Sequence, residues 1–194
     1  SGNAVSVTTT LNNSFGSKLY VEDSGFFLNN EMDDFSSKPG YPNFFGVLGS
    51  EANSIRPGKR MLSAMTPTIV LKNNKPILIL GSPGGPSIIT SVFQTILNVI
   101  EYNMDVNEAV SAPRFHHQWY PDLIVMEKDV SSTDVDSILK SKNYLIVKLP
   151  IKSDTLGVYK RADIGAVDAI LIDESGNVSG GADLRREHYS SSVD

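Results

Sequence analysis

The stretch that most constrains the fold is Ile-Leu-Ile-Leu-Gly-Ser-Pro-Gly-Gly-Pro-Ser-Ile-Ile-Thr, residues 77–90. Its short apolar run ends at Gly81 and predicts a buried strand. Residues 87–102 carry apolar side chains at helical spacing and predict an amphipathic helix. The apolar side of that helix comprises Ile88, Val92, Thr95, Ile96, Val99 and Ile100. A strand, a glycine turn and a helix bring backbone N–H groups together near a helix N-terminus, where negative charge is favoured. The charge can be that of a phosphate or of a tetrahedral oxyanion.

The composition narrows the class of protein. A chain of 194 residues with 40% hydrophobic residues suits a single domain, 1–194, with a substantial core. The net charge of -5, without a basic cluster, argues against nucleic acid or anionic lipid as a partner. No apolar run approaches the roughly eighteen residues of a membrane span. The absence of cysteine excludes a disulfide scaffold, thiolate chemistry and cysteine-ligated zinc. We expect no cofactor.

Patterning along the chain predicts an α/β (α+β) fold with mostly antiparallel strands. Strands are expected at 4–11 and 25–28, and a hairpin joins 61–72 to 76–80 across Asn73-Asn74-Lys75. A capping box at 105–109 begins a short helix. A β-α-β unit is expected at 123–127, 131–142 and 144–149, with Ser132 or Thr133 capping its helix. After a loop containing glycine and charged residues, a last hairpin pairs 166–172 with 178–182.

A polar group follows the apolar strand 25–28 directly. It reads Asn-Asn-Glu-Met-Asp-Asp over residues 29–34. Carboxylates beside an apolar strand need cations or N–H donors as partners, which favours a binding site. The alternative is an ordinary polar loop with Asx-turns. The residues alone leave both interpretations open.

The segment 38–58 is rich in glycine and proline and carries Tyr41, Phe44 and Phe45. Connections of this length tend to be lids or binding loops, so the aromatic rings can form a gate over a pocket. Alternatively, the rings simply fix the loop to the surface.

Residues 112–119 hold two of the three histidines and the only tryptophan. Adjacent histidines project in different directions, and no carboxylate stands at ligand spacing, so we predict no metal site. A packed, hydrogen-bonded turn is favoured instead.

The glycine turn matches neither a phosphate loop nor a serine nucleophile. A P-loop requires Lys followed by Ser or Thr after its last glycine, whereas Pro86 and Ser87 follow Gly85. A dinucleotide-binding fold requires an acidic residue on the next parallel strand, which this order of elements does not provide. Pro83 directly after Ser82 removes the N–H that a nucleophile elbow uses. The N–H groups of Gly84 and Gly85 remain as an oxyanion hole, with the nucleophile supplied from elsewhere.

Four blocks, 28–35, 57–68, 81–85 and 112–118, resemble the small subunit of γ-glutamyltranspeptidase. The likeness runs from about Gly2 to Asp183 in the same order and spacing. It implies the N-terminal nucleophile hydrolase fold, a four-layer αββα sandwich. In this family a precursor cuts itself autocatalytically into a large and a small subunit. The new N-terminal threonine attacks a γ-glutamyl amide, typically glutathione, and the γ-glutamyl group passes to an amino acid, a peptide or water.

The resemblance also implies a role for particular residues. Gly84 and Gly85 match the oxyanion hole, and Thr10 matches the hydroxyl that hydrogen-bonds the nucleophile. The substrate's α-ammonium is held at positions that match Asn12, Glu31 and Asp34. Ser63 matches the first of two serines that hold the α-carboxylate with an arginine of the large subunit, and Phe45 matches the gating aromatic of the lid.

This sequence departs from the family pattern at two places. Ala64 stands where many members have the second serine, which predicts weaker substrate binding rather than inactivity. The family's Thr-Thr-His start is expected upstream of Gly2, so these residues alone are expected to be inactive. Ser1 is an N-terminal hydroxyl, but the resemblance places it partway along a hairpin and away from the site.

Three functions remain open from the sequence. The resemblance favours a γ-glutamyltransferase or glutathione hydrolase, located in the periplasm or outside the cell. A second possibility is an inactive homologue that only binds γ-glutamyl compounds or a partner chain. The third is another N-terminal nucleophile hydrolase with a different acyl substrate, which the ammonium-binding acids disfavour.

Overall fold

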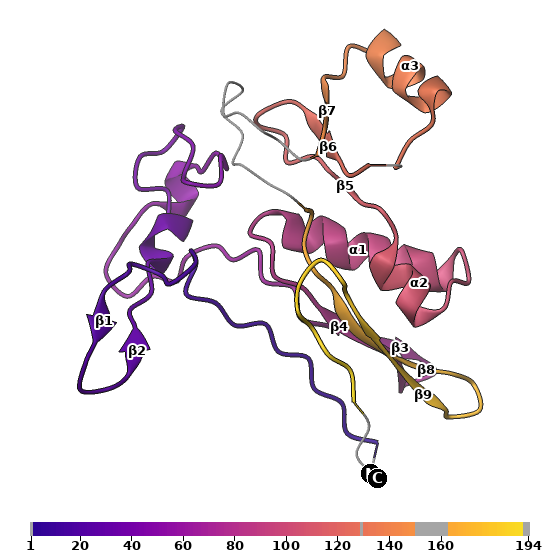
Figure 1. Cartoon of the computed structure of the whole chain (residues 1–194). Coiled ribbons are helices and arrows are strands. Elements are labelled where there is room, and N and C mark those ends of the chain that lie inside the picture. The colour runs from indigo at the N-terminus through magenta and orange to yellow at the C-terminus, as the bar shows by residue number, and fades with distance from the viewer. Residues whose placement is uncertain (1, 129, 150–162, 192–194) are drawn as a thin grey trace.

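The computed structural model describes residues 2–128, 130–149 and 163–191 (Figure 1). Ser1 and most of the loop predicted after Leu149 lie outside the described residues. The described elements form a four-stranded sheet, a three-stranded sheet and a two-stranded hairpin, with three α-helices. The predicted α+β class with mostly antiparallel strands is confirmed.

The four-stranded sheet has the strand order β3-β4-β8-β9 and is antiparallel throughout. Its strands are β3 (Thr68–Lys72), β4 (Lys75–Gly81), β8 (Asp168–Ile172) and β9 (Val178–Ala182). Asn73 and Asn74 join β3 to β4 with φ of 52° and 62°, as a type I′ hairpin turn requires. Both predicted hairpins are confirmed, although the strand expected from 61 begins only at Thr68. Pro67 has no N–H to donate to a sheet, which limits extension of β3 on that side.

Helices α1 (Ser87–Ile100) and α2 (Val106–Ser111) cover one face of this sheet. Asp105 and Glu108 form the predicted capping box of α2. The buried core comprises Leu78, Leu80, Ile88, Val92, Val106, Val110, Val167 and Ala169. The predicted apolar side of α1 is buried or half-buried as far as Val99. Ile100, the last residue of α1, is 43% exposed, so the prediction is wrong there.

A second, smaller unit lies beyond α1 (Figure 1). It contains β5 (Phe115–His116), β6 (Ile124–Met126), α3 (Thr133–Ser141) and β7 (Ile146–Lys148). β6 and β7 are parallel, with α3 as the crossover, and Ser132 Oγ caps α3 by accepting from the N–H of Val135. The predicted β-α-β unit is therefore confirmed with shorter strands.

The N-terminal arm, residues 2–19, does not form the predicted half-buried strand at 4–11. Val5 and Val7 are 75% and 74% exposed. Alternation of Val and Thr favours an extended backbone, but a strand also needs a partner, and no described segment pairs with these residues. Ser6 Oγ nevertheless donates to the carbonyl of Leu80 at 2.7 Å, and a Cβ on Gly81 would lie 3.0 Å from Thr8 Oγ1. Because side chains alternate along β4, these contacts place the arm on the sheet face opposite the helices.

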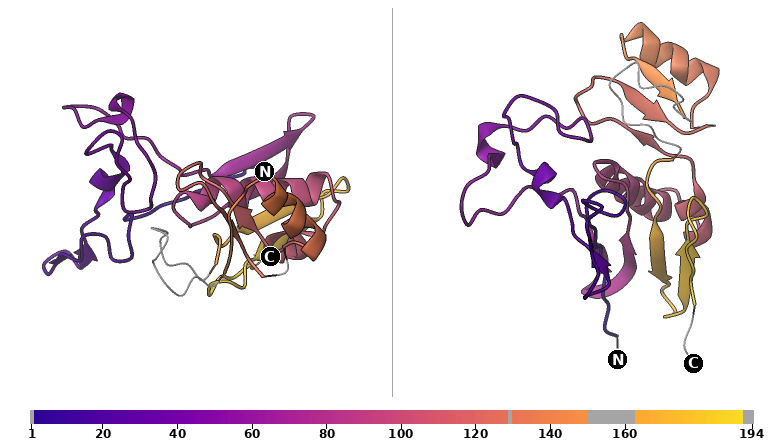
Figure 2. Two further views of the ribbon diagram at one scale, coloured as in Figure 1. Left: turned by 90° about the horizontal axis from the view of Figure 1, so that it is seen from above. Right: turned by 60° about the vertical axis from the view of Figure 1, so that its left-hand side comes forward.

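Beyond the arm, the chain forms β1 (Tyr20–Val21), β2 (Phe26–Phe27) and the 3₁₀ turns η1 (Glu31–Asp34) and η2 (Glu51–Asn53). Figures 1 and 2 show this part standing apart from the four-stranded sheet and joined to it by extended chain. Of the expected four layers, the described residues build one helix layer and the sheet that it covers, and the arm runs along the open face.

Candidate active site

The predicted strand, glycine turn and helix are all present. β4 ends at Gly81 and α1 begins at Ser87. Gly84 and Gly85 have φ of 144° and 56°, which side-chain-bearing residues rarely adopt. Their carbonyl oxygens accept the first hydrogen bonds of the helix, from Ser87 N at 3.2 Å and Ile88 N at 3.1 Å. Within the described part of the chain, the N–H groups of Gly84 and Gly85 donate to no other group. Two backbone donors at the start of α1 are therefore available to an anion.

A short segment, residues 163–167, packs behind the turn. A Cβ added to Gly84 would lie 3.1 Å from the Cα of Gly165. Ser82 Oγ accepts from the N–H of Ala166 at 3.0 Å, and Ser91 Oγ lies 3.3 Å from the carbonyl oxygen of Ile164. This contact could not be predicted from the sequence, because a lone glycine before a strand has many possible causes.

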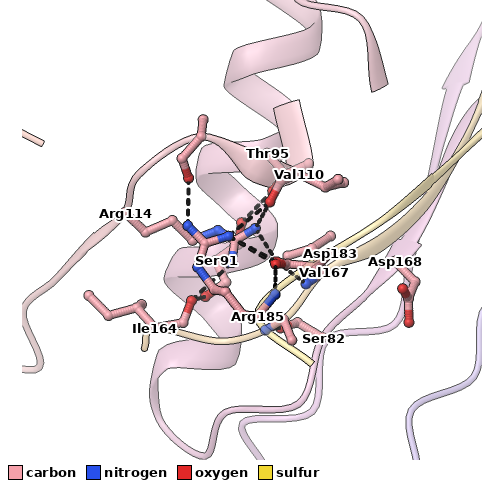
Figure 3. Close-up of polar contacts among 12 residues, drawn as sticks. Ser82, Ser91, Thr95, Val110, Arg114, Ile164, Val167, Asp168, Asp183 and Arg185 are labelled. Atoms are coloured by element: carbon pink, nitrogen blue, oxygen red, sulfur yellow. Dashed lines mark hydrogen bonds and ion pairs between the residues drawn. The ribbon is translucent and has the colours of Figure 1, made fainter. Parts of the chain in front are cut away.

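A buried network of charges holds this segment in place (Figure 3). Arg114 is 1% exposed, and its Nη2 lies 2.8 Å from Asp183 Oδ2. Arg185 bridges Asp183, at 3.0 Å, and Glu127. Both backbone polar groups of Ile164 are hydrogen-bonded to this network. Its N–H donates to Glu127 Oε1 at 2.9 Å, and its carbonyl accepts from Arg114 Nη1 at 3.0 Å. These charged groups therefore hold the segment 163–167 in place behind the glycine turn.

Burial alone would raise the pKa of Asp183. The N–H of Arg185 and the charge of Arg114 outweigh that effect and hold the pKa of Asp183 below its ordinary value. The carboxylate therefore stays ionised in the core, where paired charges are tolerated.

A pocket of about 1080 Å³ opens in front of the glycine turn. Every residue that the sequence resemblance selected lines this pocket: Thr10, Asn12, Glu31, Asp34, Phe45, Ser63, Gly84 and Gly85. Ala64, the departure from the family pattern, lines it as well. Five separate segments of the chain thus converge on one cavity.

The acidic wall of the pocket consists of Glu31 and Asp34 on η1. Burial, and then the nearby charge of Asp34, raises the pKa of Glu31. Burial, and then Asp33, raises the pKa of Asp34. Glu31 Oε1 is buried, and no described group donates a hydrogen bond to it. The polar-loop interpretation also holds in part, since Asn29 Oδ1 accepts from the N–H of Glu31 in an Asx-turn. No cation among the residues that the structure describes pairs with these carboxylates, and a bound ammonium group would supply one.

The remaining polar residues are oriented by local hydrogen bonds. Thr10 Oγ1 accepts from the N–H of Asn12 at 2.8 Å, and Ser63 Oγ accepts from the N–H of Met65 at 3.1 Å. Each hydroxyl therefore keeps its hydrogen for another acceptor. Asn12 Nδ2 donates to the carbonyl of Asn30 at 3.0 Å, so the Asn12 side-chain oxygen is the atom left to receive a donor.

The predicted lid-type loop, 38–58, reaches the glycine turn. A Cβ on Gly85 would lie 3.0 Å from Cε1 of the Phe45 ring, so ring and glycine are in contact. The loop is not structureless, because it contains η2 and a bridge between Pro42 and Leu48. Gating and anchoring, which the sequence left as alternatives, are both compatible with this contact.

Residues 112–119 differ in part from the predicted packed turn. Phe115–His116 forms β5, and Trp119 is 71% exposed rather than packed. The hydrogen bonding is confirmed: His116 contacts Thr90 and Gln118, and His117 Nε2 lies 3.0 Å from Asp122. Among the residues that the structure describes, no group of His, Asp and Glu side chains is placed to hold a metal ion.

The pocket has two available backbone N–H groups on one side and acidic and hydroxyl side chains on the others, an arrangement that can stabilise an oxyanion and receive a cationic group. A family model described as gamma-glutamyltranspeptidase matches residues 1–193. This chain belongs to the gamma-glutamyltranspeptidase family and to the N-terminal nucleophile hydrolases.

Individual relatives support the assignment to this family. The glutathione hydrolase proenzyme of Escherichia coli (strain K12) is 45% identical over 184 residues, which is 95% of this chain and 30% of the proenzyme. The structure of the T380A mutant of Helicobacter pylori gamma-glutamyltranspeptidase superposes with a TM-score of 0.85 at 50% identity and covers 95% of both chains. The enzyme from Pseudomonas nitroreducens gives a TM-score of 0.86 at 41% identity, covering 100% of this chain and 95% of the other.

The chain thus spans under a third of the curated proenzyme it matches. In the described part of the structure, no helix has the length and apolar character needed to cross a membrane.

Proposed function

We propose that this chain forms the oxyanion hole and the head-group pocket of a γ-glutamyltransferase and glutathione hydrolase. One observation carries the proposal: the pocket has the two available N–H groups of Gly84 and Gly85 on one wall and, on another, the buried Oε1 of Glu31, to which no described group donates a hydrogen bond. A γ-glutamyl amide has both matching groups, a carbonyl that becomes an oxyanion and an α-ammonium.

In the proposed reaction, the substrate's γ-carbonyl oxygen accepts hydrogen bonds from Gly84 and Gly85. The nucleophile is the family's N-terminal threonine, whose own amine serves as its base. Attack forms the bond from the threonine oxygen to the γ-carbonyl carbon, and the threonine amine takes the hydroxyl proton. The C–N bond of the γ-glutamyl amide then breaks, and the substrate's nitrogen leaves with that proton. The hydroxyl of Thr10 donates a hydrogen bond to the nucleophile. The γ-glutamyl ester then reacts with an amino acid, a peptide or water, which releases the threonine.

The head group is held by the other walls of the same pocket. Asn12, Glu31 and Asp34 receive the α-ammonium, whose positive charge stabilises both ionised carboxylates. Ser63 donates to the α-carboxylate, together with an arginine of the large subunit. Ala64 offers no hydroxyl at the neighbouring position, so one hydrogen bond to the carboxylate is missing.

A large subunit from the same precursor is the proposed partner. The relatives are proenzymes, and one solved gamma-glutamyltranspeptidase is described as having critical roles for its C-terminus in autoprocessing. Exposed apolar side chains of the N-terminal arm support such a partner: Val5 and Val7 beside the four-stranded sheet, and Phe15 and Leu19 near β2. We further propose that 1–194 acts as one domain with 38–58 as its lid, and that the mature enzyme is periplasmic or extracellular.

The test uses the full-length precursor of the gene that encodes this chain. After maturation, it should release the chromophore from a γ-glutamyl anilide, faster when an acceptor dipeptide is added. Gly84→Ala should abolish most of this release. A correctly processed protein that binds glutathione without turnover would replace this proposal with the inactive binding homologue.

A further inference from the structure

The side-chain amide of Gln118 joins two parts of the pocket wall that are distant in the sequence. Its Nε2 donates to the carbonyl oxygen of Phe45 at 3.1 Å and to that of Tyr120 at 3.0 Å. Phe45 belongs to the loop 38–58, whereas Gln118 follows β5. One amide group therefore ties the loop to the β5 segment.

A buried histidine fixes the direction of this amide. His116 is 3% exposed, and its Nε2 lies 2.9 Å from Gln118 Oε1. Its Nδ1 lies 2.9 Å from Thr90 Oγ1 on α1. Because Gln118 Nε2 donates to two carbonyls, Gln118 Oε1 is the acceptor, and His116 Nε2 must carry the hydrogen. The contacts thus run from α1, through the imidazole ring and the amide, to the loop.

The other end of the Phe45 peptide is fixed as well. Asn43 Oδ1 accepts from the N–H of Phe45 at 3.1 Å and from that of Val47 at 3.0 Å. Asn43 Nδ2 donates to the carbonyl of Asp33 at 3.3 Å, within the acidic wall. The backbone that carries the Phe45 ring is therefore held between the two walls of the pocket while the ring rests on Gly85.

We propose that Gln118 is a positioning residue that keeps the loop 38–58 closed over the glycine turn, with His116 orienting its amide. Only the catalytic consequence rests on the proposed function. A closed loop retains the γ-glutamyl donor and limits the access of water to the acyl-enzyme. Loss of the Gln118 contact opens the loop more often, so the donor dissociates faster and water intercepts a larger share of turnovers.

Hydrogen exchange on the full-length, matured protein tests the inference. Gln118→Leu removes both donated hydrogen bonds at nearly constant size. Amide exchange over residues 43–48 should accelerate about fivefold or more, the factor expected for one net hydrogen bond. Exchange in β4 and α1 should stay at the wild-type rate. Thr90→Val, which removes the anchor of His116 on α1, should act in the same direction with a smaller effect.

Gln94 provides a matched control. Its Nε2 donates to the carbonyls of Phe115 and Thr90, each at 2.8 Å, and its Oε1 accepts from the Phe115 N–H at 3.1 Å. The hydrogen bonds of Gln94 in the described structure thus join α1 to β5 and do not include the loop. Gln94→Leu should leave exchange over 43–48 unchanged. The inference is overturned if Gln118→Leu leaves that exchange unchanged, or if Gln94→Leu accelerates it equally.

Kinetic measurements on the same variant separate this inference from the proposed function. In an active enzyme, Gln118→Leu should raise KM for the anilide and lower the ratio of transfer to hydrolysis. If the wild-type enzyme lacks γ-glutamyl activity, the proposed function fails, and the exchange data still decide the role of Gln118.

Discussion

Gly85 and Phe45 are in contact, because a Cβ added to Gly85 would lie 3.0 Å from Cε1 of the Phe45 ring. At the neighbouring Gly84, a would-be Cβ lies 2.9 Å from Ser87 Oγ and also meets buried backbone, 3.1 Å from the Cα of Gly165. A ring can swing away from an added methyl group, whereas a buried peptide segment cannot. The two glycines should therefore respond differently to the same substitution.

Gly84→Ala should lower kcat about 100-fold or more, because displacing an oxyanion-hole donor costs that much. Gly85→Ala should lower kcat less and raise KM, since it displaces the Phe45 ring. Gly58→Ala is the control: its φ is 71°, but nothing lies within 4 Å of its would-be Cβ. That variant should lose about 1 kcal/mol of stability and keep kcat. Equal kcat values for Gly84→Ala and Gly58→Ala would contradict the assigned role of Gly84.

Glu31→Gln should raise KM for γ-glutamyl donors about 10- to 100-fold, the range for a hydrogen bond to a charged group. The change removes the charge that faces the ammonium group and preserves the size of the side chain. Glu51→Gln is the control, because Glu51 is exposed and its carboxylate makes only surface contacts among the described residues, with Arg56 at 3.6 Å and Ser54 Oγ at 3.2 Å. Steady-state kinetics should show an unchanged KM for Glu51→Gln. A donor without an α-ammonium group should be insensitive to Glu31→Gln.

The pH dependence of binding follows from the raised pKa values of Glu31 and Asp34. The ammonium group binds the ionised carboxylates, so KM should rise as the pH falls, beginning above the pH at which ordinary carboxyls titrate. The contribution of these two carboxyls to the stability of the ligand-free protein depends on pH in the opposite direction, increasing as the pH falls. A carboxyl whose pKa is raised on folding contributes stability below its unfolded pKa, and this is lost as the pH rises through the folded value.

Glu31→Gln/Asp34→Asn should therefore have a higher Tm than the wild type at neutral pH, with the difference shrinking at acidic pH. Thermal melts across the pH range measure this. A double variant that is less stable than the wild type at neutral pH would show that the two carboxylates have partners within the protein.

Ala64→Ser should lower KM for the γ-glutamyl donor by about tenfold, the lower end of the range for a hydrogen bond to a charged group, because it restores one hydrogen bond to a carboxylate. Ser63→Ala should raise KM by a similar factor. Neither change alters the glycine turn, so kcat should move little. An Ala64→Ser enzyme whose KM does not fall would contradict the proposed position of the α-carboxylate.

Asp183→Asn should destabilise the protein by about 3–5 kcal/mol, because it leaves the fully buried Arg114 without its carboxylate. Glu174→Gln should change stability by under about 0.5 kcal/mol, since the Lys72–Glu174 pair is exposed. The pKa of Asp183 is lowered on folding, so its contribution is present above the unfolded pKa and is lost as the pH falls through the folded value. The Tm difference between wild type and Asp183→Asn should accordingly shrink in acid.

The parts of the structure predicted correctly from sequence depend on local patterns. The β4 strand, the glycine turn, the α1 helix and the capping box at Asp105 are each encoded within a few neighbouring residues. The predicted strand at 4–11 is wrong because strand formation depends on a partner, which local patterning does not reveal.

The site shows the same division between local and distant information. The resemblance selects its residues, of which Thr10, Asn12 and Phe45 lie outside the four matching blocks, and the pocket brings them together. The packing of Gly165 behind Gly84 and the hydrogen bond from Arg114 to the Ile164 carbonyl join residues about 50 positions apart or more. No local sequence pattern marks these contacts. Gln118 lay in a segment that the sequence did single out, but its amide contact with Phe45 spans 73 positions and required the structure.

The part of the chain around β1 and β2, which continues into η1 with Glu31 and Asp34, stands apart from the four-stranded sheet (Figure 1), whose strand β4 leads into the turn with Gly84 and Gly85. Selection can therefore alter which head group is recognised without disturbing the buried scaffold of the reaction centre. Libraries confined to residues 29–34 and 61–65 would explore new acyl donors at little risk to folding. Related enzymes can diverge in substrate by the same route while retaining one chemistry.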